Sequence, residues 1–143
     1  MFKGAEAAGK DLGVTVEELG TPKHDAAGQI GVLESATAGK PAAIVIAPTV
    51  TEALGDPISA VTDGGIPVTK IDSAATTENY ASFLTTNNHA GGGSAADGMA
   101  ACIKERTGKV AGMVAGKVAY ITAMAGYESL DSRDNGLIEG VAA

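Results

Sequence analysis

A carboxylate follows a short run of β-branched residues in the stretch GIPVTKIDSAATT, residues 65–77. The run from Ile66 to Ile71 is typical of a strand, and Asp72 stands at its carboxyl end. An ionised carboxylate only accepts hydrogen bonds, and it can accept them from two adjacent hydroxyl groups. Asp at a strand end also often forms an Asx-turn. The position of Asp72 therefore leaves a ligand contact and a local turn equally open.

Other polar residues also follow apolar runs. Asn87 and Asn88 follow SFLTT, where amide groups can bind a polyol or cap the next helix; we expect at least one of them to act as a cap. Arg133 has a planar guanidinium that can reach a ligand, although a helix-surface Arg is usually solvated. His24 and His89 have no Cys or carboxylate at ligand spacing, so the pattern does not favour a metal site.

The segments that position these residues alternate between strand and helix patterns. This alternation is typical of βαβ units and a parallel sheet. We expect an α/β fold with an open, mostly parallel sheet and helices on both faces, in a flavodoxin- or Rossmann-like three-layer arrangement. Ligands of such sheets bind beyond the carboxyl ends of the strands. The predicted strands are 14–19, 42–47, 66–71, 82–86 and 117–124, and the predicted helices are 2–13, 25–39, 56–65, 93–108 and 129–142.

Local patterns make several of these predictions more specific. The apolar run 42–47 is typical of a strand buried on both faces. Asp56 suits a helix N-cap and Pro57 the first helical position. Cys102 excludes an intrachain disulfide because it is the one cysteine, and its apolar helical surroundings predict a buried, inert thiol.

Composition and charge exclude several classes of function. The formal net charge of the 143 residues is −7, without clusters of Lys or Arg, which argues against nucleic acid or an anionic membrane as the partner. The chain has no phosphate loop, dinucleotide fingerprint, nucleophile elbow or Cys–His pair. We therefore expect no enzyme and no cofactor. We also see no membrane-spanning run and no signal peptide.

The order of several stretches closely resembles the periplasmic sugar-binding proteins of ABC transporters, of the ribose-binding type. The stretches that carry the resemblance are KGAEAAGKDLGV, QIGVLESATAGKPAAIVIAPT, GIPVTKIDS, SFLTTNNHAGGGSAADGMA and GKVAYITAMAG with SRDNGLIEGV. They run along nearly the whole chain. The resemblance implies a lobe of the type I periplasmic binding fold, a sugar or polyol as ligand, an ABC transporter permease as partner, and a periplasmic or extracellular location.

The resemblance also implies roles for individual residues. Asp72 matches the family's acceptor of sugar hydroxyls, Asn88 matches the Asn of its T-D-N motif, and Arg133 matches the arginine that reaches the sugar from the second lobe. Ser73 stands at the ligand-binding position where many members have Arg. Further departures are Ala47 for a frequent Asn, Lys70 for an apolar residue and Asn87 for Asp, and they leave the sugar unassigned.

Family members are longer and clamp the sugar between two lobes. By this comparison we expect residues 1–106 to be an amino-terminal lobe without its first strand, and residues 107–143 to begin the second lobe. The absent strand would leave unpaired backbone groups on its neighbours. We hypothesise that 117–124 fills the gap, either within the chain or across a strand-swapped homodimer.

Two alternatives from other classes remain open. One is the effector-binding core of a lactose-repressor-type transcription regulator, which shares the fold and would need a helix-turn-helix ahead of residue 1. The other is a fragment that binds no ligand. An enzyme on a flavodoxin-like fold is the least favoured reading.

Overall fold

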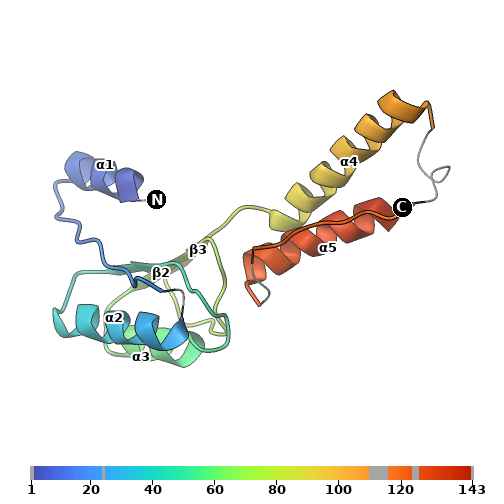
Figure 1. The fold of residues 1–143 in the computed structure, drawn as a ribbon. Coiled ribbons are helices and arrows are strands. Elements are labelled where there is room, and N and C mark those ends of the chain that lie inside the picture. The colour runs from blue at the N-terminus through green and yellow to red at the C-terminus, as the bar shows by residue number, and fades with distance from the viewer. Residues whose placement is uncertain (1, 24, 110–115, 124–125, 143) are drawn as a thin grey trace.

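A computed structural model describes residues 2–23, 25–109, 116–123 and 126–142. Five helices and three strands are present in these ranges (Figure 1). In chain order they are α1 (Phe2–Leu12), α2 (Ala26–Ala38), β1 (Ile44–Ile46), α3 (Gly55–Asp63), β2 (Val68–Ile71), β3 (Ser82–Leu84), α4 (Asn88–Thr107) and α5 (Glu128–Ala142).

The three strands form one open parallel sheet in the order β1-β2-β3. Helix α3 connects β1 to β2, whereas a loop without helix connects β2 to β3. The register places Ile46, Lys70 and Phe83 side by side across the sheet. Parallel strands with a helical crossover confirm the predicted α/β class.

The first two helices begin and end where the sequence predicts. Gly13 adopts a positive φ of 69° directly after α1, a conformation that suits glycine at a helix end. The Asp25 side chain accepts a hydrogen bond of 2.6 Å from the Gly28 N–H, and Gly39 is the C-cap of α2. Local capping chemistry is therefore sufficient to set these boundaries.

The starts of α3 and α4 differ from the predictions. The N-cap of α3 is Leu54 and not Asp56, because Leu54 is fully buried in the core and its backbone already begins the helical turn. Helix α4 begins at Asn88 and not near Gly93. The Asn87 side chain accepts a hydrogen bond from the Ala90 N–H, so the cap lies ahead of the three glycines 91–93.

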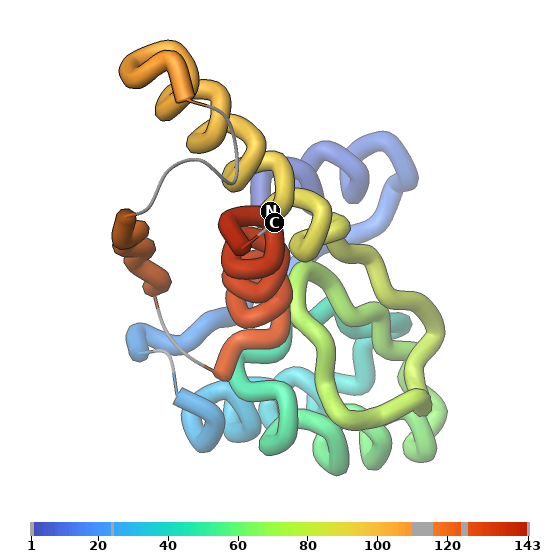
Figure 2. Tube along the Cα trace, turned by 90° about the vertical axis from the view of Figure 1, so that its right-hand side faces the viewer, coloured from blue at the N-terminus to red at the C-terminus, as the bar shows by residue number. Residues whose placement is uncertain are grey.

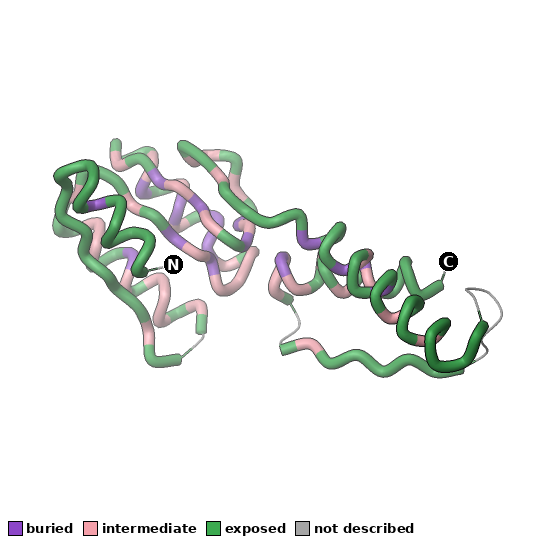
Figure 3. Tube along the Cα trace, turned by 90° about the horizontal axis from the view of Figure 1, so that it is seen from above, coloured by how far each residue is buried: buried purple, intermediate pink, exposed green. Residues whose placement is uncertain are grey.

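One face of the sheet packs against α2 and α3. Leu54, Ile58 and Val68 are completely buried between these layers. Each such aliphatic side chain contributes about 1.5–3 kcal/mol by leaving water. Figure 3 shows most of the buried residues in this part of the molecule, whereas the surfaces of α1, α4 and α5 are largely exposed. The complete core cluster is Leu33, Ile46, Leu54, Ile58, Val61, Val68 and Ala75.

The opposite face of the sheet is open. Val45 is 64% exposed and Leu84 is 62% exposed, so the prediction that 42–47 is buried on both faces is wrong. Helix α1 lies on this side of the sheet, opposite α2 and α3 (Figures 1 and 2), but within the described residues it contacts no other helix or strand. The periodicity of a three-residue strand does not reveal whether a covering layer actually packs on it.

Two predicted strands do not form. Residues 14–19 and 116–122 have no regular secondary structure, and Ile121 is 99% exposed. A β-branched segment becomes a strand only when a neighbouring edge pairs with it, and neither segment pairs with the three-stranded sheet. The hypothesis that 117–124 fills a gap in the sheet of its own chain is therefore wrong for the described residues. Residue 124 lies outside those residues, and the strand-swapped homodimer stays a prediction.

Helices α4 and α5 form a closely packed pair beside the sheet (Figure 1). Gly136 of α5 lies against the backbone of His89, and Gly92 of α4 lies against the backbone of Arg133. Because α4 contacts no element but α5 in the described part of the chain, Cys102 faces solvent. The prediction of a buried thiol is wrong. The division at residues 106 and 107 stays a prediction.

None of the described helices has the length and apolar character needed to cross a membrane.

Candidate functional site

Asp72 joins the carboxyl ends of two neighbouring strands. Its N–H donates a 2.9 Å hydrogen bond to the carbonyl of Leu84, and its carbonyl accepts one from the Thr85 hydroxyl. The residue has a positive φ of 67°, a conformation that Asp tolerates better than most side chains. Within the described residues no hydrogen bond occupies its exposed carboxylate. The structure therefore contains no Asx-turn at Asp72, and the carboxylate is available to a ligand.

Ser73 connects the end of β2 to the start of α5. Its side chain is only 3% exposed, and its hydroxyl oxygen lies 2.9 Å from that of Ser129, which is 6% exposed. Each hydroxyl can donate to the other. This buried pair fixes the first turn of α5 against the loop that carries Asp72.

Asn88 and Arg133 interact directly. Asn88 is 4% exposed in the first turn of α4, and its side-chain oxygen accepts a hydrogen bond from the Arg133 guanidinium of α5. Ser129 and Arg133 are four residues apart on α5, so they share a face of that helix. Ser73 and Asn88 therefore contact the same face of α5, through Ser129 and Arg133. Asp72 directly precedes Ser73 in the chain.

An open cavity of about 390 Å³ is lined by the start of α5, the first turn of α4 and the loop after β1. Its volume falls within the range that small ligands occupy. None of the four predicted residues lines it, although His89 adjoins Asn88 and Ser132 adjoins Arg133 in the sequence. Hydroxyl-binding groups dominate the lining, which consists of Thr51, Glu52, His89, Gly126, Glu128, Asp131, Ser132 and Asn135.

Most of this lining could not be predicted from the sequence. Thr51 and Glu52 follow the predicted strand 42–47, so they lie beyond the carboxyl end of a strand, where ligands of such sheets bind. Glu128, Asp131, Ser132 and Asn135 have the i, i+3, i+4, i+7 spacing of one helix face, which was the available signal for the other wall. Thr51 of the cavity lining also contacts the loop that follows Asp72 and Ser73, because its carbonyl accepts a hydrogen bond from the Thr76 N–H.

Gln29 positions the loop that follows β1. Its side-chain amide donates a 2.7 Å hydrogen bond to the carbonyl of Ala47, and its oxygen accepts bonds from both the N–H and the hydroxyl of Thr49. One side chain of α2 therefore holds the loop that leads to Thr51 and Glu52. Its position in the otherwise apolar stretch 26–33 of α2 was the available signal.

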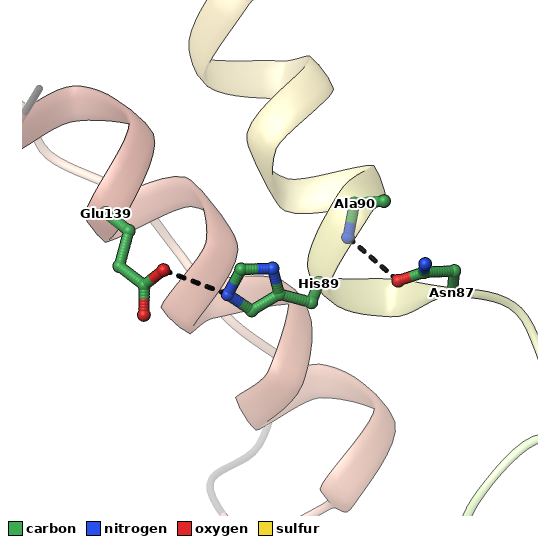
Figure 4. Close-up of polar contacts among 4 residues, drawn as sticks. All are labelled: Asn87, His89, Ala90 and Glu139. Atoms are coloured by element: carbon green, nitrogen blue, oxygen red, sulfur yellow. Dashed lines mark hydrogen bonds and ion pairs between the residues drawn. The ribbon is translucent and has the colours of Figure 1, made fainter.

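Besides the Asn88–Arg133 bond, two further polar contacts hold the first turn of α4 (Figure 4). Asn87 caps the helix, as one of the two asparagines was expected to do, and His89 Nε2 lies 3.1 Å from Glu139 Oε2 of α5. Both side chains of the second contact are more than half exposed, and an exposed pair contributes little to stability. The contact orients His89 at the cavity wall.

Two ionisable groups near the site have shifted pKa values. Desolvation by burial lowers the pKa of the Lys70 ammonium below its usual value, and the nearby Glu78 carboxylate opposes that shift. The same Glu78 raises the pKa of the Tyr80 phenol, assisted by desolvation and by a hydrogen bond between the two side chains. In the described residues no group of three or more His, Cys, Asp or Glu side chains is arranged to hold a metal ion.

A parallel α/β sheet whose polar carboxyl edge is faced by a further helix is the arrangement of a ligand-binding α/β lobe. The family described as periplasmic binding protein domain matches residues 1–143. The chain belongs to this family, and the resemblance found in the sequence is confirmed.

Solved structures agree with this assignment. A carbohydrate transporter solute-binding protein from Agrobacterium radiobacter, in complex with D-arabinose, is 48% identical over 99% of this chain and 47% of that chain, with a TM-score of 0.90. An ABC transporter solute-binding protein from Agrobacterium vitis, bound with α-D-tagatopyranose, is 30% identical over 99% and 48% of the two chains, with a TM-score of 0.85. AraP, an arabinose-binding protein from Geobacillus stearothermophilus, is 35% identical over 99% and 45%, with a TM-score of 0.77.

The chain spans about half the length of these solved relatives. The relatives belong to sugar transport systems, which does not favour the transcription-regulator alternative. No curated protein matches the chain.

Proposed function

We propose that the chain forms part of the sugar-binding component of an ABC-type carbohydrate import system. The observation that carries the proposal is the polar edge at which Ser73 meets Ser129 and Asn88 meets Arg133, beside the exposed carboxylate of Asp72. The relatives bound to D-arabinose and tagatose support a small neutral sugar as the ligand.

Each residue has a distinct part in binding. The Asp72 carboxylate accepts hydrogen bonds from two adjacent sugar hydroxyls, and the Asn88 amide both donates and accepts. Arg133 donates from its guanidinium while its bond to Asn88 restricts its direction. Ser73 contributes through its buried hydroxyl pair with Ser129, which holds α5 close to the loop that carries Asp72. In the intact protein, a second wall closes over the sugar and excludes water.

Several features of the whole protein are part of the same proposal. Residues 1–106 belong to one lobe and 107–143 to the next, so a sugar at this edge lies where the lobes meet. The family suggests a periplasmic or extracellular location. The partner in transport is an ABC transporter permease that receives the loaded protein.

Thermal unfolding with a panel of sugars tests the proposal. A ligand that binds only the folded chain stabilises it by about 2.7 kcal/mol at a hundredfold excess over Kd. We expect one neutral pentose or hexose at millimolar concentration to raise the Tm. Asp72→Ala should abolish the shift, whereas Asp97→Ala, an exposed carboxylate on α4, should retain it. A cooperatively unfolding chain whose Tm responds to no sugar would contradict the proposal.

A further inference from the structure

Lys70 is a buried cation on the helix-covered face of β2. The side chain is only 3% exposed, although the neighbouring core positions are aliphatic. Its register neighbours are Ile46 and Phe83. A buried charge is costly unless other groups surround it with compensating contacts. The residue therefore has a specific set of partners.

Those partners come from the loop after the strand and from β3. The Lys70 ammonium donates hydrogen bonds of 3.0 Å to the carbonyl of Thr77 and 3.3 Å to the carbonyl of Ala75. The nitrogen also lies 3.6 Å from the centroid of the Tyr80 ring, a cation–π contact, and 5.1 Å from the Phe83 ring. Two carbonyl dipoles and two aromatic faces replace the water that the ammonium loses.

These contacts close a ring that runs along the chain from Lys70 to Ala75 and contains Asp72 and Ser73. The ring begins at the Lys70 backbone, passes through both residues, and returns at Ala75 to the ammonium of the same Lys70. The loop is also joined to the loop after β1, because the Thr76 N–H donates a 3.0 Å hydrogen bond to the carbonyl of Thr51. Asp72 is thus held between strand β2 and a loop that Lys70 anchors.

We propose that Lys70 is a positioning residue whose ammonium, by binding the Ala75 and Thr77 carbonyls, sets the conformation of loop 73–77 and so directs the Asp72 carboxylate and the Ser73 hydroxyl at the sheet edge. This role deepens the proposed sugar binding and rests on it for its functional consequence. The conformational part stands on the contacts of Lys70 alone.

Amide hydrogen exchange of Lys70→Met tests the conformational part without any sugar. Met retains most of the packing and removes the buried charge, a replacement that often leaves stability equal or higher. We expect the exchange of the Thr76 and Thr77 amides to accelerate at least tenfold, while the Tm does not fall. Lys104→Met, an exposed lysine on α4, is the matched control and should change neither quantity.

Sugar binding tests the functional consequence. We expect Lys70→Met to weaken the affinity for the identified sugar about tenfold, and we expect its effect to be less than additive with Asp72→Ala, because one residue acts through the other. If the wild-type chain binds no sugar, the proposed function fails, and the exchange experiment still decides the role of Lys70.

Three results would overturn the role of Lys70. The first is unchanged exchange at Thr76 and Thr77 in Lys70→Met. The second is failure of this variant to fold, or accelerated exchange throughout the sheet with a lower Tm, since either would show a purely structural residue. The third is full additivity with Asp72→Ala in sugar binding.

Discussion

The sheet unit, residues 26–84, and the helix pair, residues 88–142, are held together in different ways. The sheet unit has side chains at its centre, with Leu54, Ile58 and Val68 fully buried. The helix pair has glycines at its contact, where Gly136 and Gly92 bring two backbones together. The sheet unit therefore depends on the volume of its side chains, whereas the helix pair depends on glycines that have no side chain at the contact.

The comparison explains where the candidate site lies. Asp72 and Ser73 come from the sheet unit, whereas Asn88 and Arg133 come from the helix pair. Within the described residues, the Ser73 and Ser129 hydroxyls form a hydrogen bond between the sheet unit and the helix pair at this edge, so the junction is polar. A polar junction between two separately packed units can change its geometry at lower cost than a close-packed core can.

The largest effect is expected from a cavity in the sheet unit. Ile58→Ala should reduce the free energy of unfolding by about 2–5 kcal/mol, because Ile58 is completely buried and the surrounding core cannot fully collapse. Urea unfolding measures the change. Val45→Ala, on the open face, should stay within about 0.5 kcal/mol. Equal losses for the two variants would contradict the one-sided core.

Crowding of the helix pair should have the next largest effect. A Cβ at Gly136 would overlap the carbonyl of His89. Gly136→Ala should therefore separate α4 from α5 and cost about 1–3 kcal/mol. Gly98→Ala on α4 is the control, because a Cβ there meets nothing within 4 Å and alanine favours helix. Circular dichroism during thermal unfolding measures the stability of the two variants. A Gly136→Ala variant as stable as wild type would contradict the close approach of the two helix backbones.

Removal of one hydroxyl at the junction should have a smaller effect. Ser73→Ala leaves the buried Ser129 hydroxyl without its partner and should cost about 1–3 kcal/mol, at the low end because a serine hydroxyl is small. The double variant Ser73→Ala, Ser129→Ala should cost less than the sum of the two single changes. A double-mutant cycle by chemical denaturation gives this coupling. Strict additivity would mean that the two hydroxyls do not interact.

The smallest expected effect is the pH dependence that Lys70 contributes to the sheet unit. Burial lowers the pKa of Lys70 in the folded chain, so between that pKa and the ordinary value of 10.5 the unfolded chain binds more protons. The free energy of unfolding should therefore gain a contribution that rises with pH in this window and is constant below it. Wild type and Lys70→Met compared across alkaline pH isolate this contribution. If the free energy of unfolding rose more steeply with pH in Lys70→Met than in wild type, the predicted direction of the Lys70 contribution would be wrong.

Sequence patterns predicted the sheet unit well. Asp25 and Gly39 mark the ends of α2 through capping that needs only nearby residues. The apolar runs that contain β1 and β2 are distinct enough to identify. The three-residue lengths of β1 and β3 were not predictable, because strand length depends on the pairing partner and not only on local preference.

The helix pair and the candidate site were less predictable. Cys102 is exposed because α4 packs on only one side, and a helical pattern does not say how many sides are covered. The residues 117–124 have strand character, yet those that the structure describes remain unpaired. The contacts Ser73–Ser129 and Asn88–Arg133 join positions 56 and 45 residues apart, and family resemblance pointed to three of these four residues.

Amide chemical-shift mapping during a sugar titration tests the central claim most directly. The claim predicts that the sugar which raises the Tm shifts the amides of Asp72, Ser73, Asn88 and Arg133 together, with one Kd, and that Asp72→Ala removes these shifts. Absence of any shift at saturating sugar, or shifts confined to α1 and the open face of the sheet, would contradict a sugar site at the junction of the two regions.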